Sequence, residues 1–384
     1  MEKAKLISCF EELYGQNEKE IRTFFSPGRV NIIGEHQDYN GGHVFPAALE
    51  LGIYAAVRVR DDRTVRFVSE TRKHPITISL DDELAYKPKQ YWTNYPIGIM
   101  DQLQQEGYTL PGMDLYFWGD LPAGAGLSSS ACILDLMGYI CYSLLGVEVD
   151  RTHLAQIAQQ AEYHFVGVKV GIMDQFAISQ GKAGHGVLLN CTTMEFRLVP
   201  LTWGNYSIVI MNTNKERDLV SSDFNTRIAE CEAALEALRE VRPTLEGLSL
   251  ATLEEVEAIR DEVLRKRARH AVSENLRVLA FEEALHHNDV HQIAELINAS
   301  HASLDKDFEV TIFELNAIVE IARKQEGCIA ARMIGAGFGG CAIAFVENAH
   351  VEAFKDSVSK KYYEVTNHQA TMYDAAIGDG VKEI

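Results

Sequence analysis

The stretch "GEHQDYNGG", residues 34–42, places two acids and an imidazole within four positions. Glu35, His36 and Asp38 carry the side-chain types that bind metal ions, transfer protons in catalysis or accept hydrogen bonds from a sugar. A zinc site is disfavoured, because three tetrahedral ligands are hard to arrange so close together in sequence. A polar surface turn is the plainer alternative. The residue types alone leave catalysis, sugar binding and a polar turn open.

A glycine-rich loop, "PAGAGLSSSA" at residues 122–131, has the composition of a phosphate-binding loop. Gly124 and Gly126 allow the backbone to approach an anion, and the three serines stand where a helix is expected to begin. The free amides and the dipole of a helix N-terminus favour negative charge. The loop lacks the Gly-Lys-Ser/Thr of a Walker A motif. A serine-rich helix cap without a ligand is the alternative.

A second glycine-rich loop, "GAGFGG" at residues 335–340, matches the G-x-G-x-x-G pattern of dinucleotide-binding enzymes. That pattern is meaningful between a strand and a helix, within a βαβ unit. The segment that follows, "CAIAFV", is typical of a strand. We therefore expect a tight glycine turn between two strands, and a dehydrogenase is the weakest of the functions considered.

Two further patterns have plainer interpretations than a functional site. The histidines of "HHNDVH", residues 286–291, could share a metal ion but are typical of a polar turn between helices. The basic run "RKRARH", residues 265–270, is interpreted as a solvated helix face. Neither pattern is taken as a binding site.

Composition and charge limit the kinds of partner. The chain has 384 residues and a net charge of −19, from 36 basic and 55 acidic side chains, which disfavours binding to nucleic acid. Seven cysteines without a C-x-x-C pair indicate buried thiols in a reducing compartment. The sequence begins without a signal-peptide pattern and has no apolar run of membrane-spanning length. We expect a cytoplasmic protein that contacts neither nucleic acid nor membrane.

The pattern of apolar residues predicts the elements that hold these loops. Strand-like alternation dominates before the first glycine-rich loop, a helix follows that loop up to Gly146, and Asp150 caps the next helix. A strand at residues 206–213 is followed by helices at about 221–300, 308–325 and 350–365. The fold class is therefore α+β, with domains at residues 1–200 and 201–384. The last strand can return to the first domain.

Three segments, in this order and at this spacing, resemble motifs of the GHMP small-molecule kinases. "GRVNIIGEHQDYNGGHVFPAAL" is similar to the signature of the galactokinases within that superfamily, "GDLPAGAGLSSSAC" to the phosphate loop, and "AARMIGAGFGGC" to the third motif. The resemblance extends from about residue 25 to residue 346. It implies an N-terminal domain like the second domain of ribosomal protein S5, a ferredoxin-like C-terminal domain, and an active site between them.

The resemblance also implies a reaction and its partners. Galactokinases phosphorylate the anomeric hydroxyl of α-D-galactose with MgATP, so galactose, ATP and Mg²⁺ are the expected ligands, with no obligate protein partner. Asp174 matches the candidate base, and Arg29 matches the cation that stabilises charge on the transferring phosphoryl group. Glu35 and His36 are expected to face the 6-hydroxyl, and Asp38 the 3- and 4-hydroxyls. On this basis the opening cluster is a sugar-binding clamp.

The remaining site residues are also assigned by matching motifs. Sugar-binding positions are Glu35, His36, Gln37, Asp38, Gly171 and Phe224. ATP-binding positions are Ser69, Gly124, Ala125, Gly126, Leu127, Ser128, Ser129 and Ser130. The magnesium ligands are Ser130 and Glu162.

The chain departs from the family pattern at several positions that bear on the substrate. Phe224 replaces a tyrosine whose hydroxyl contacts the sugar, and Ile228 replaces an arginine. Lys169 and Val170 stand just before the catalytic loop where other residues are usual. These differences keep open a kinase for another sugar, such as N-acetylgalactosamine. A non-catalytic sensor of sugar and ATP is the second alternative, because the resemblance extends to such proteins, although Ser128–Ser130, Asp174 and Arg29 all stand here. A uronate substrate is disfavoured, because Glu35 would repel its carboxylate.

Overall fold

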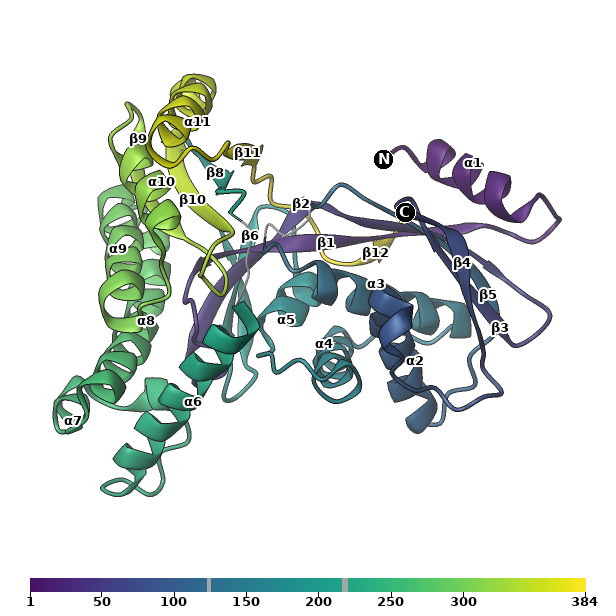
Figure 1. Ribbon diagram of the computed structural model, residues 1–384, viewed down its shortest axis with the longest axis horizontal. Coiled ribbons are helices and arrows are strands. Elements are labelled where there is room, and N and C mark those ends of the chain that lie inside the picture. Colours follow the sequence, from purple (N-terminus) through teal and green to yellow (C-terminus); the bar gives the residue numbers. More distant parts are fainter. Residues whose placement is uncertain (123–125, 216–219) are drawn as a thin grey trace.

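The computed structural model describes residues 1–122, 126–215 and 220–384, with the side chains of residues 220–222 left aside (Figure 1). Within these ranges the chain forms two β-sheets, each with helices packed against it. Strands and helices are largely segregated along each half, and most of the neighbouring strands described are antiparallel. The predicted α+β class is therefore confirmed.

The first sheet has the strand order β12-β1-β2-β5-β3-β4, and β6 pairs with β2 and β7. Strands β3 and β5 are parallel, whereas the other pairs described in this sheet are antiparallel. Its strands are β1 (Arg22–Ile33), β2 (His43–Val59), β3 (Thr64–Ser69), β4 (Arg72–Ser79), β5 (Met113–Gly119), β6 (His185–Asn190), β7 (Phe196–Pro200) and β12 (Lys382–Glu383). The last strand of the chain therefore lies in the N-terminal sheet.

Helices cover both faces of this sheet (Figure 1). On one face, α1 (Lys3–Tyr14) packs Leu6 and Phe10 against the sheet. On the other face lie α2 (Asn94–Gln105), α3 (Ser129–Leu145), α4 (Arg151–Gln160) and α5 (Met173–Gln180), with a π-helix at Ala161–Val166 and a 3₁₀ turn at Pro88–Thr93.

The predicted limits of the two helices after the phosphate loop are confirmed. Helix α3 ends at Gly146, whose φ of 68° is a left-handed conformation that suits glycine. The carboxylate of Asp150 accepts hydrogen bonds from the backbone N–H groups of Thr152 and His153 and so caps α4. The start of α3 is fixed at the serine cluster, which brings the N-terminus of this helix to the candidate site.

The second sheet has the order β11-β8-β10-β9 and carries the C-terminal helices. Helices α10 and α11 pack on one face, and α8 and α9 pack toward the first sheet. The strands are β8 (Tyr206–Asn212), β9 (Cys328–Met333), β10 (Cys341–Glu347) and β11 (Thr371–Asp374). The helices are α6 (Val220–Arg239), α7 (Leu253–Glu257), α8 (Glu262–His286), α9 (Val290–Ser303), α10 (Phe313–Arg323) and α11 (Val351–Thr366), with short helical turns at Leu248–Leu250, Leu304–Phe308 and Asn348–His350.

The two sheets share one hydrophobic cluster. It contains Val30 and Ile32 of β1, Phe345 of β10 and Phe281 of α8. The predicted domain boundary falls in the link between β7 and β8, where the chain leaves the first sheet for the second. The division into two domains remains a prediction. None of the helices in the described ranges combines the length and apolarity that a bilayer span needs.

The "GAGFGG" loop connects β9 to β10, which pair as an antiparallel hairpin. Four of its glycines have positive φ, from 79° to 128°, and Phe338 also has positive φ. The predicted glycine turn between two strands is confirmed, and no strand-to-helix context for a dinucleotide exists at this loop.

The interpretation of residues 265–270 as a solvated face is wrong. Arg267 is 3% exposed and forms ion pairs with Glu230 and Glu309, and His270 is fully buried. Helix α6 and the segment after α9 cover this face of α8 and supply the partners. The histidines at 286–291, by contrast, do mark the turn between α8 and α9, and no group of metal-binding side chains was found among the described residues.

Candidate functional site

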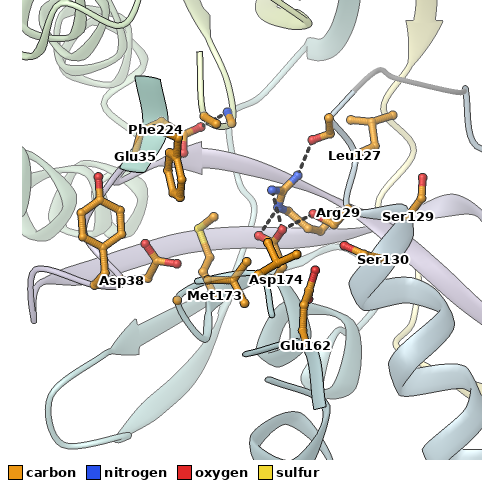
Figure 2. A pocket seen from close by; sticks show the side chains of 18 of the residues that line it. Arg29, Glu35, Asp38, Leu127, Ser129, Ser130, Glu162, Met173, Asp174 and Phe224 are labelled. Atoms are coloured by element: carbon orange, nitrogen blue, oxygen red, sulfur yellow. Dashed lines mark hydrogen bonds and ion pairs between the residues drawn. The ribbon is translucent and has the colours of Figure 1, made fainter. Parts of the chain in front are cut away.

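One cavity, of about 460 Å³, collects residues from both halves of the chain (Figure 2). It is bounded by β1, the loop at residues 34–39, the start of α3, the π-helix, the segment before α5, helix α6 and the β9–β10 hairpin. The predicted site residues that line it are Arg29, Glu35, His36, Asp38, Gly126, Leu127, Ser128, Ser129, Ser130, Glu162, Gly171, Asp174 and Phe224. Gly124 and Ala125 lie outside the described residues.

Arg29 and Asp174 form a two-pronged ion pair in this cavity. Arg29 Nε donates to Asp174 Oδ1 at 2.7 Å, and Nη2 donates to Oδ2 at 2.9 Å. Arg29 Nη1 donates to the carbonyl of Gly126 at 2.7 Å, and the Ser128 hydroxyl donates to Asp174 Oδ2. The arginine is 6% exposed and the aspartate 28%. The carboxylate is thus fixed from behind and remains open to the cavity.

Gly28 brings the phosphate loop close to β1. A side chain at residue 28 would meet Leu121 at 2.5 Å and the carbonyl oxygen of Leu127 at 2.8 Å. The backbone N–H of Arg29 donates to that carbonyl at 3.3 Å. Ser128, with φ of 63°, then turns the chain into α3. This close approach sets the N-terminus of α3 beside the Arg29–Asp174 pair.

The start of α3 combines free amides with an acidic group. Ser130 hydrogen-bonds to Glu162 of the π-helix, and Gln175 Nε2 donates to Glu162 Oε2 at 2.8 Å. Burial, together with the nearby Asp174, raises the pKa of Glu162 to about 7 in spite of these hydrogen bonds. Glu162 has no cationic partner among the described residues. Its carboxylate and the Ser130 hydroxyl are suitable oxygen ligands for Mg²⁺.

A second cavity, of about 540 Å³, adjoins the first, and Tyr95, Ser129 and Ser130 line both. Its wall includes the aromatic side chains of Trp92 and Trp118. Ser69, predicted to contact ATP, lies here and not in the first cavity. The position of this apolar cavity beyond the start of α3 suits a flat heterocycle attached to a phosphate chain.

Glu35 is 1% exposed and is held by three groups. Oε1 accepts from the backbone N–H of Gly335 at 2.8 Å, and lies 3.1 Å from Nη2 of Arg332. Oε2 accepts from Asn31 Nδ2 at 2.8 Å. Burial raises the pKa of Glu35, and the Arg332 charge is the largest influence that opposes this rise. A carboxylate has about four acceptor positions, so one remains for a ligand hydroxyl.

His36 presents an unsatisfied ring nitrogen at the cavity. Its Nδ1 is 2.8 Å from the hydroxyl of Tyr39, whereas Nε2 is buried and has no hydrogen-bond partner within the described residues. Burial lowers the pKa of His36 well below the usual value, so the imidazole is neutral. Its ring packs 6.0 Å from that of Phe224 and 4.5 Å from that of Phe308.

Asp38 faces the same cavity and is packed against Gly171. A Cβ at residue 171 would lie 1.9 Å from Asp38 Oδ2, so this position requires glycine. Burial and repulsion from Asp174 and Glu35 raise the pKa of Asp38 to about 7. Figure 2 shows Asp174 between Asp38 on one side and Ser130 with Glu162 on the other. The cavity therefore has an acidic end and a helix-terminus end, with the Arg29–Asp174 pair between them.

Comparisons with protein families and with known proteins give the same result for both halves of the chain. Residues 8–59 match the galactokinase galactose-binding signature, residues 94–182 the N-terminal domain of GHMP kinases and residues 281–364 their C-terminal domain. A galactokinase of Ligilactobacillus salivarius is 46% identical over 389 residues, with all of both chains covered. The chain belongs to the galactokinase family. A second galactokinase, from Streptococcus suis, is 45% identical over 99% of this chain and 98% of its own.

Solved structures show the same relation for this galactokinase-family chain. The crystal structure of Lactococcus lactis galactokinase complexed with galactose has a TM-score of 0.95 at 42% identity, with 99% of each chain covered. The mevalonate kinase of Methanococcus jannaschii has a TM-score of 0.64 at 16% identity and covers 95% of this chain. The latter likeness concerns the fold alone. The predicted GHMP kinase fold is confirmed.

One predicted sugar-binding position of this galactokinase-family chain lies away from the cavity. Gln37 is fully buried, and its Oε1 accepts a hydrogen bond from Ser249 at 2.7 Å. A side chain at Gly42 would come within 2.1 Å of the same oxygen. The positive φ of His36, 61°, accompanies a change in direction that separates Gln37 from its neighbours. The structure thus offers Gln37 no direct contact with a ligand in the cavity.

Several lining residues were missed in the sequence analysis. Gly335 and Ala336 belong to the glycine hairpin, for which the sequence predicts a turn and a family motif but no site residue, and Tyr39 stands inside the opening motif. Met173 precedes Asp174. For Tyr95 and Val168 the sequence gives no signal, because they reach the cavity through the packing of α2 and the π-helix.

Proposed function

We propose that this chain transfers the γ-phosphoryl group of MgATP to the anomeric hydroxyl of α-D-galactose, giving galactose 1-phosphate and ADP. Its membership of the galactokinase family supports this proposal, as does its likeness to a relative crystallised with galactose. The observation that carries it is the cavity of about 460 Å³ in which the Arg29–Asp174 pair separates an acidic end from the start of α3.

Asp174 is the proposed partner of the attacking hydroxyl. In the transfer a bond forms between the anomeric oxygen and the γ-phosphorus, the bond from that phosphorus to the bridging oxygen of ADP breaks, and the hydroxyl proton passes to Asp174. Arg29 fixes the carboxylate with two hydrogen bonds, so little reorientation is needed before attack. Its positive charge would also stabilise the negative charge that develops on the transferring phosphoryl group.

The phosphates are proposed to bind at the start of α3. The backbone amides of residues 128–130 and the helix dipole favour a polyanion there. Ser130 and Glu162 are the proposed ligands of Mg²⁺, and a bound ion would neutralise charge on the phosphate oxygens. The neighbouring aromatic cavity, with Ser69 at its wall, would receive the adenine.

The sugar is proposed to bind at the acidic end. A neutral sugar offers only hydroxyl groups, and hydrogen bonds to ionised acceptors are stronger than neutral ones. Glu35 and Asp38 would accept from hydroxyls, and neutral His36 has a free Nε2 for another. Gly171 permits the position of Asp38, and Phe224 supplies an apolar wall.

The test is ADP release by the purified chain with MgATP and galactose, followed by phosphorus–proton correlation in the NMR spectrum of the product. We expect stoichiometric ADP and a phosphate coupled to the anomeric proton. Binding of both ligands without ADP release would indicate the non-catalytic sensor instead. ADP release with a phosphate on any other carbon would also refute the proposal.

A further inference from the structure

Arg332 lies directly behind the sugar end of the cavity and does not line it. It is on β9, paired in register with Ile343 of β10, and its side chain is 0% exposed. Nη1 donates to the carbonyl of Ile32 at 2.8 Å, and Nη2 lies 3.1 Å from Glu35 Oε1. A guanidinium group loses its hydration in such a position, so its charge must be balanced by nearby acids.

The balance comes from a second buried acid. Glu274 of α8 is fully buried, and its Oε1 accepts from Ser300 Oγ at 2.6 Å and from the backbone N–H of Gly34 at 3.0 Å. Its Oε2 accepts from Arg277 Nε at 2.6 Å. Although burial opposes ionisation, Arg277, His270 and Arg332 lower the pKa of Glu274 to about 2. Each of the two arginines thus has an acid in contact with it, Glu35 for Arg332 and Glu274 for Arg277.

These buried residues contact the loop at residues 34–39 at two successive positions, Gly34 and Glu35. Glu274 binds the N–H of Gly34, and Nε2 of His270 is 3.2 Å from the carbonyl of Glu35. Arg332 pairs with the carboxylate of Glu35 itself. The loop of the first sheet is therefore oriented by α8 and β9, which belong to the second half of the chain.

We propose that Arg332 is a positioning residue for sugar recognition, which keeps the buried Glu35 ionised and aimed at the cavity through their ion pair. The inference rests on the proposed function, since Glu35 is there a sugar-binding acceptor. Glu35 also has Asn31 and the Gly335 amide as partners, but both are neutral. Of the groups in contact with its carboxylate, Arg332 supplies the positive charge.

The test is a double-mutant cycle with Arg332→Met, Glu35→Gln and the pair of changes together, followed by steady-state kinetics and by calorimetry of galactose binding. Loss of a charge-assisted acceptor is expected to raise the KM for galactose at least about tenfold in Arg332→Met. The KM for ATP and kcat at saturating galactose should stay within about twofold. In the double variant galactose should bind no worse than in Glu35→Gln.

The outcomes separate this inference from the proposed function. If the loss of galactose affinity in the double variant equals the product of the losses in the two single variants, Arg332 does not act through Glu35 and the inference fails. The same conclusion follows if Arg332→Met raises the KM for ATP as much as the KM for galactose. It also fails if Glu35→Gln binds galactose like the wild type, although ADP release from galactose would leave the proposed function standing. If the wild type binds galactose without turnover, the proposed function fails. The galactose affinities from calorimetry still show whether the effects of Arg332→Met and Glu35→Gln are coupled.

Folding is controlled with two further variants. Arg332→Lys keeps the charge, so the same cycle can be run with it if Arg332→Met does not fold. The rise in the KM for galactose should then be smaller. It should vanish when Arg332→Lys is combined with Glu35→Gln. Arg58→Met removes a comparably buried arginine on the far side of the first sheet. It should lower the melting temperature and leave the KM for galactose unchanged. A galactose effect of equal size in Arg58→Met would overturn the inference.

Discussion

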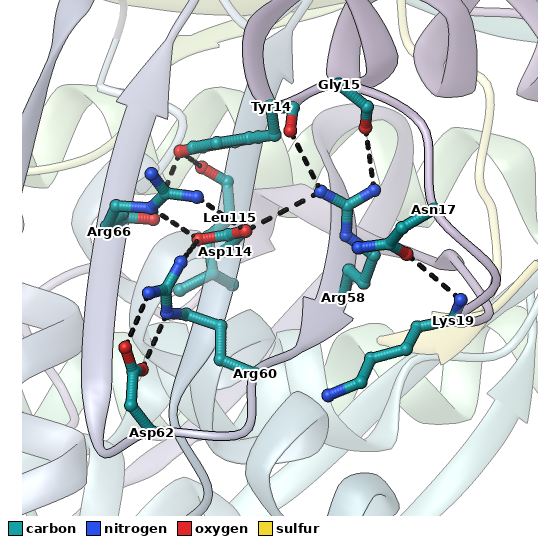
Figure 3. Close-up of polar contacts among 10 residues, drawn as sticks. All are labelled: Tyr14, Gly15, Asn17, Lys19, Arg58, Arg60, Asp62, Arg66, Asp114 and Leu115. Atoms are coloured by element: carbon teal, nitrogen blue, oxygen red, sulfur yellow. Dashed lines mark hydrogen bonds and ion pairs between the residues drawn. The ribbon is translucent and has the colours of Figure 1, made fainter.

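Two groups of buried and half-buried acids and arginines lie in the N-terminal half of this chain, and their hydrogen bonding differs. The Asp114 cluster consists of Asp114 with Arg58, Arg60 and Arg66 (Figure 3). Arg66 binds both carboxylate oxygens, at 2.6 and 2.8 Å, and Arg60 Nη1 binds Oδ1 at 3.1 Å. Arg58 lies 3.7 Å away. Every oxygen of this carboxylate is thus occupied by the protein.

The same arginines also fasten a helix. Arg58 donates to the carbonyls of Tyr14 and Gly15 at the end of α1, and Arg66 stacks over the ring of Tyr14. Asp62 binds Arg60 through two hydrogen bonds and offsets its charge. A cavity of about 410 Å³ borders this cluster, but both oxygens of Asp114 already accept hydrogen bonds from arginines. Its physical role is to tie α1 to the sheet.

The acids of the candidate site are less well satisfied. Asp38 is repelled by Asp174 and Glu35 and has no arginine partner within the described residues. Asp174 has one, yet remains 28% exposed to the cavity. The difference teaches that ion pairing alone does not distinguish a structural acid from a ligand-binding one. What distinguishes them is whether acceptor positions remain open toward a cavity.

The largest effect is expected from Asp174→Asn. This change keeps the shape of the side chain but removes its capacity to accept a proton, so turnover should fall by at least about 10²-fold. ATP affinity should stay roughly intact, because the proposed nucleotide site is at the start of α3. Measured kcat and the dissociation constant of ATP test this. Turnover near that of the wild type would make Asp174 a structural polar residue, like Asp114.

A matched pair of changes, Asp38→Asn and Asp114→Asn, tests the comparison itself. Asp38→Asn should weaken galactose binding about 10- to 100-fold, since a charge-assisted acceptor is lost. Asp114→Asn should instead lower the free energy of unfolding by about 2–3 kcal/mol, with kcat and both KM values unchanged. Calorimetry and denaturant unfolding of both variants provide the measurements. The comparison would be refuted if Asp38→Asn lowered the free energy of unfolding without weakening galactose binding, and Asp114→Asn weakened galactose binding instead.

The pH dependence sharpens the same test. Because the pKa of Asp38 is raised to about 7, the wild-type affinity for galactose should weaken as the pH falls through 7, when Asp38 gains a proton. Between pH 3.8 and about 7 the folded chain retains this proton whereas an unfolded aspartate has lost it, so the contribution of Asp38 to stability falls as the pH rises through this range and is constant above it. Asp38→Asn should remove this component of the pH dependence. If the midpoint of the pH dependence of galactose affinity is the same in Asp38→Asn as in the wild type, this titration does not belong to Asp38.

A smaller effect, on the order of tenfold in activity, is expected from Ser130→Ala and Glu162→Gln, as each removes one of two proposed magnesium ligands. Excess Mg²⁺ should restore part of the lost activity in both variants. Titration of activity with Mg²⁺ at fixed ATP is the measurement. If neither variant changes the magnesium dependence, the two residues are merely hydrogen-bonded to each other.

The smallest effect is expected at Phe224, where the chain departs from the family pattern. Phe224→Tyr restores a hydroxyl, and one neutral hydrogen bond changes affinity roughly two- to tenfold. The KM for galactose should fall by that factor and kcat should change little. A variant that loses activity on galactose would indicate that the pocket has been reshaped for another sugar.

The sequence predicted most of what depends on local pattern. The caps of α3 and α4 and the glycine turn between β9 and β10 follow from residues within a few positions of one another. The family resemblance identified thirteen residues that line the cavity. Interactions between distant segments were not predicted. The burial of Arg267 depends on Glu230, 37 residues earlier, and the partner of Arg332, Glu35, lies in the loop that follows β1 of the first sheet.

The failures have a common physical cause. Charge in a sequence predicts exposure unless a partner of opposite charge is known, and such partners come from tertiary packing. Gln37 is assigned to the sugar by matching the family motif, whereas the backbone direction at His36 turns its side chain toward Ser249. The Asp114 cluster gave no motif at all, since Arg58 on β2 and Arg66 on β3 flank Asp114 on β5, a strand that lies far from both in the sequence.

The most direct test of the account is kcat/KM of the native chain for galactose, N-acetylgalactosamine, glucose and galacturonate with saturating MgATP. The acidic end of the cavity, with Glu35 and Asp38 as acceptors, predicts galactose as the best substrate and strong rejection of the negatively charged galacturonate. A higher kcat/KM for any of the other three sugars would contradict the account.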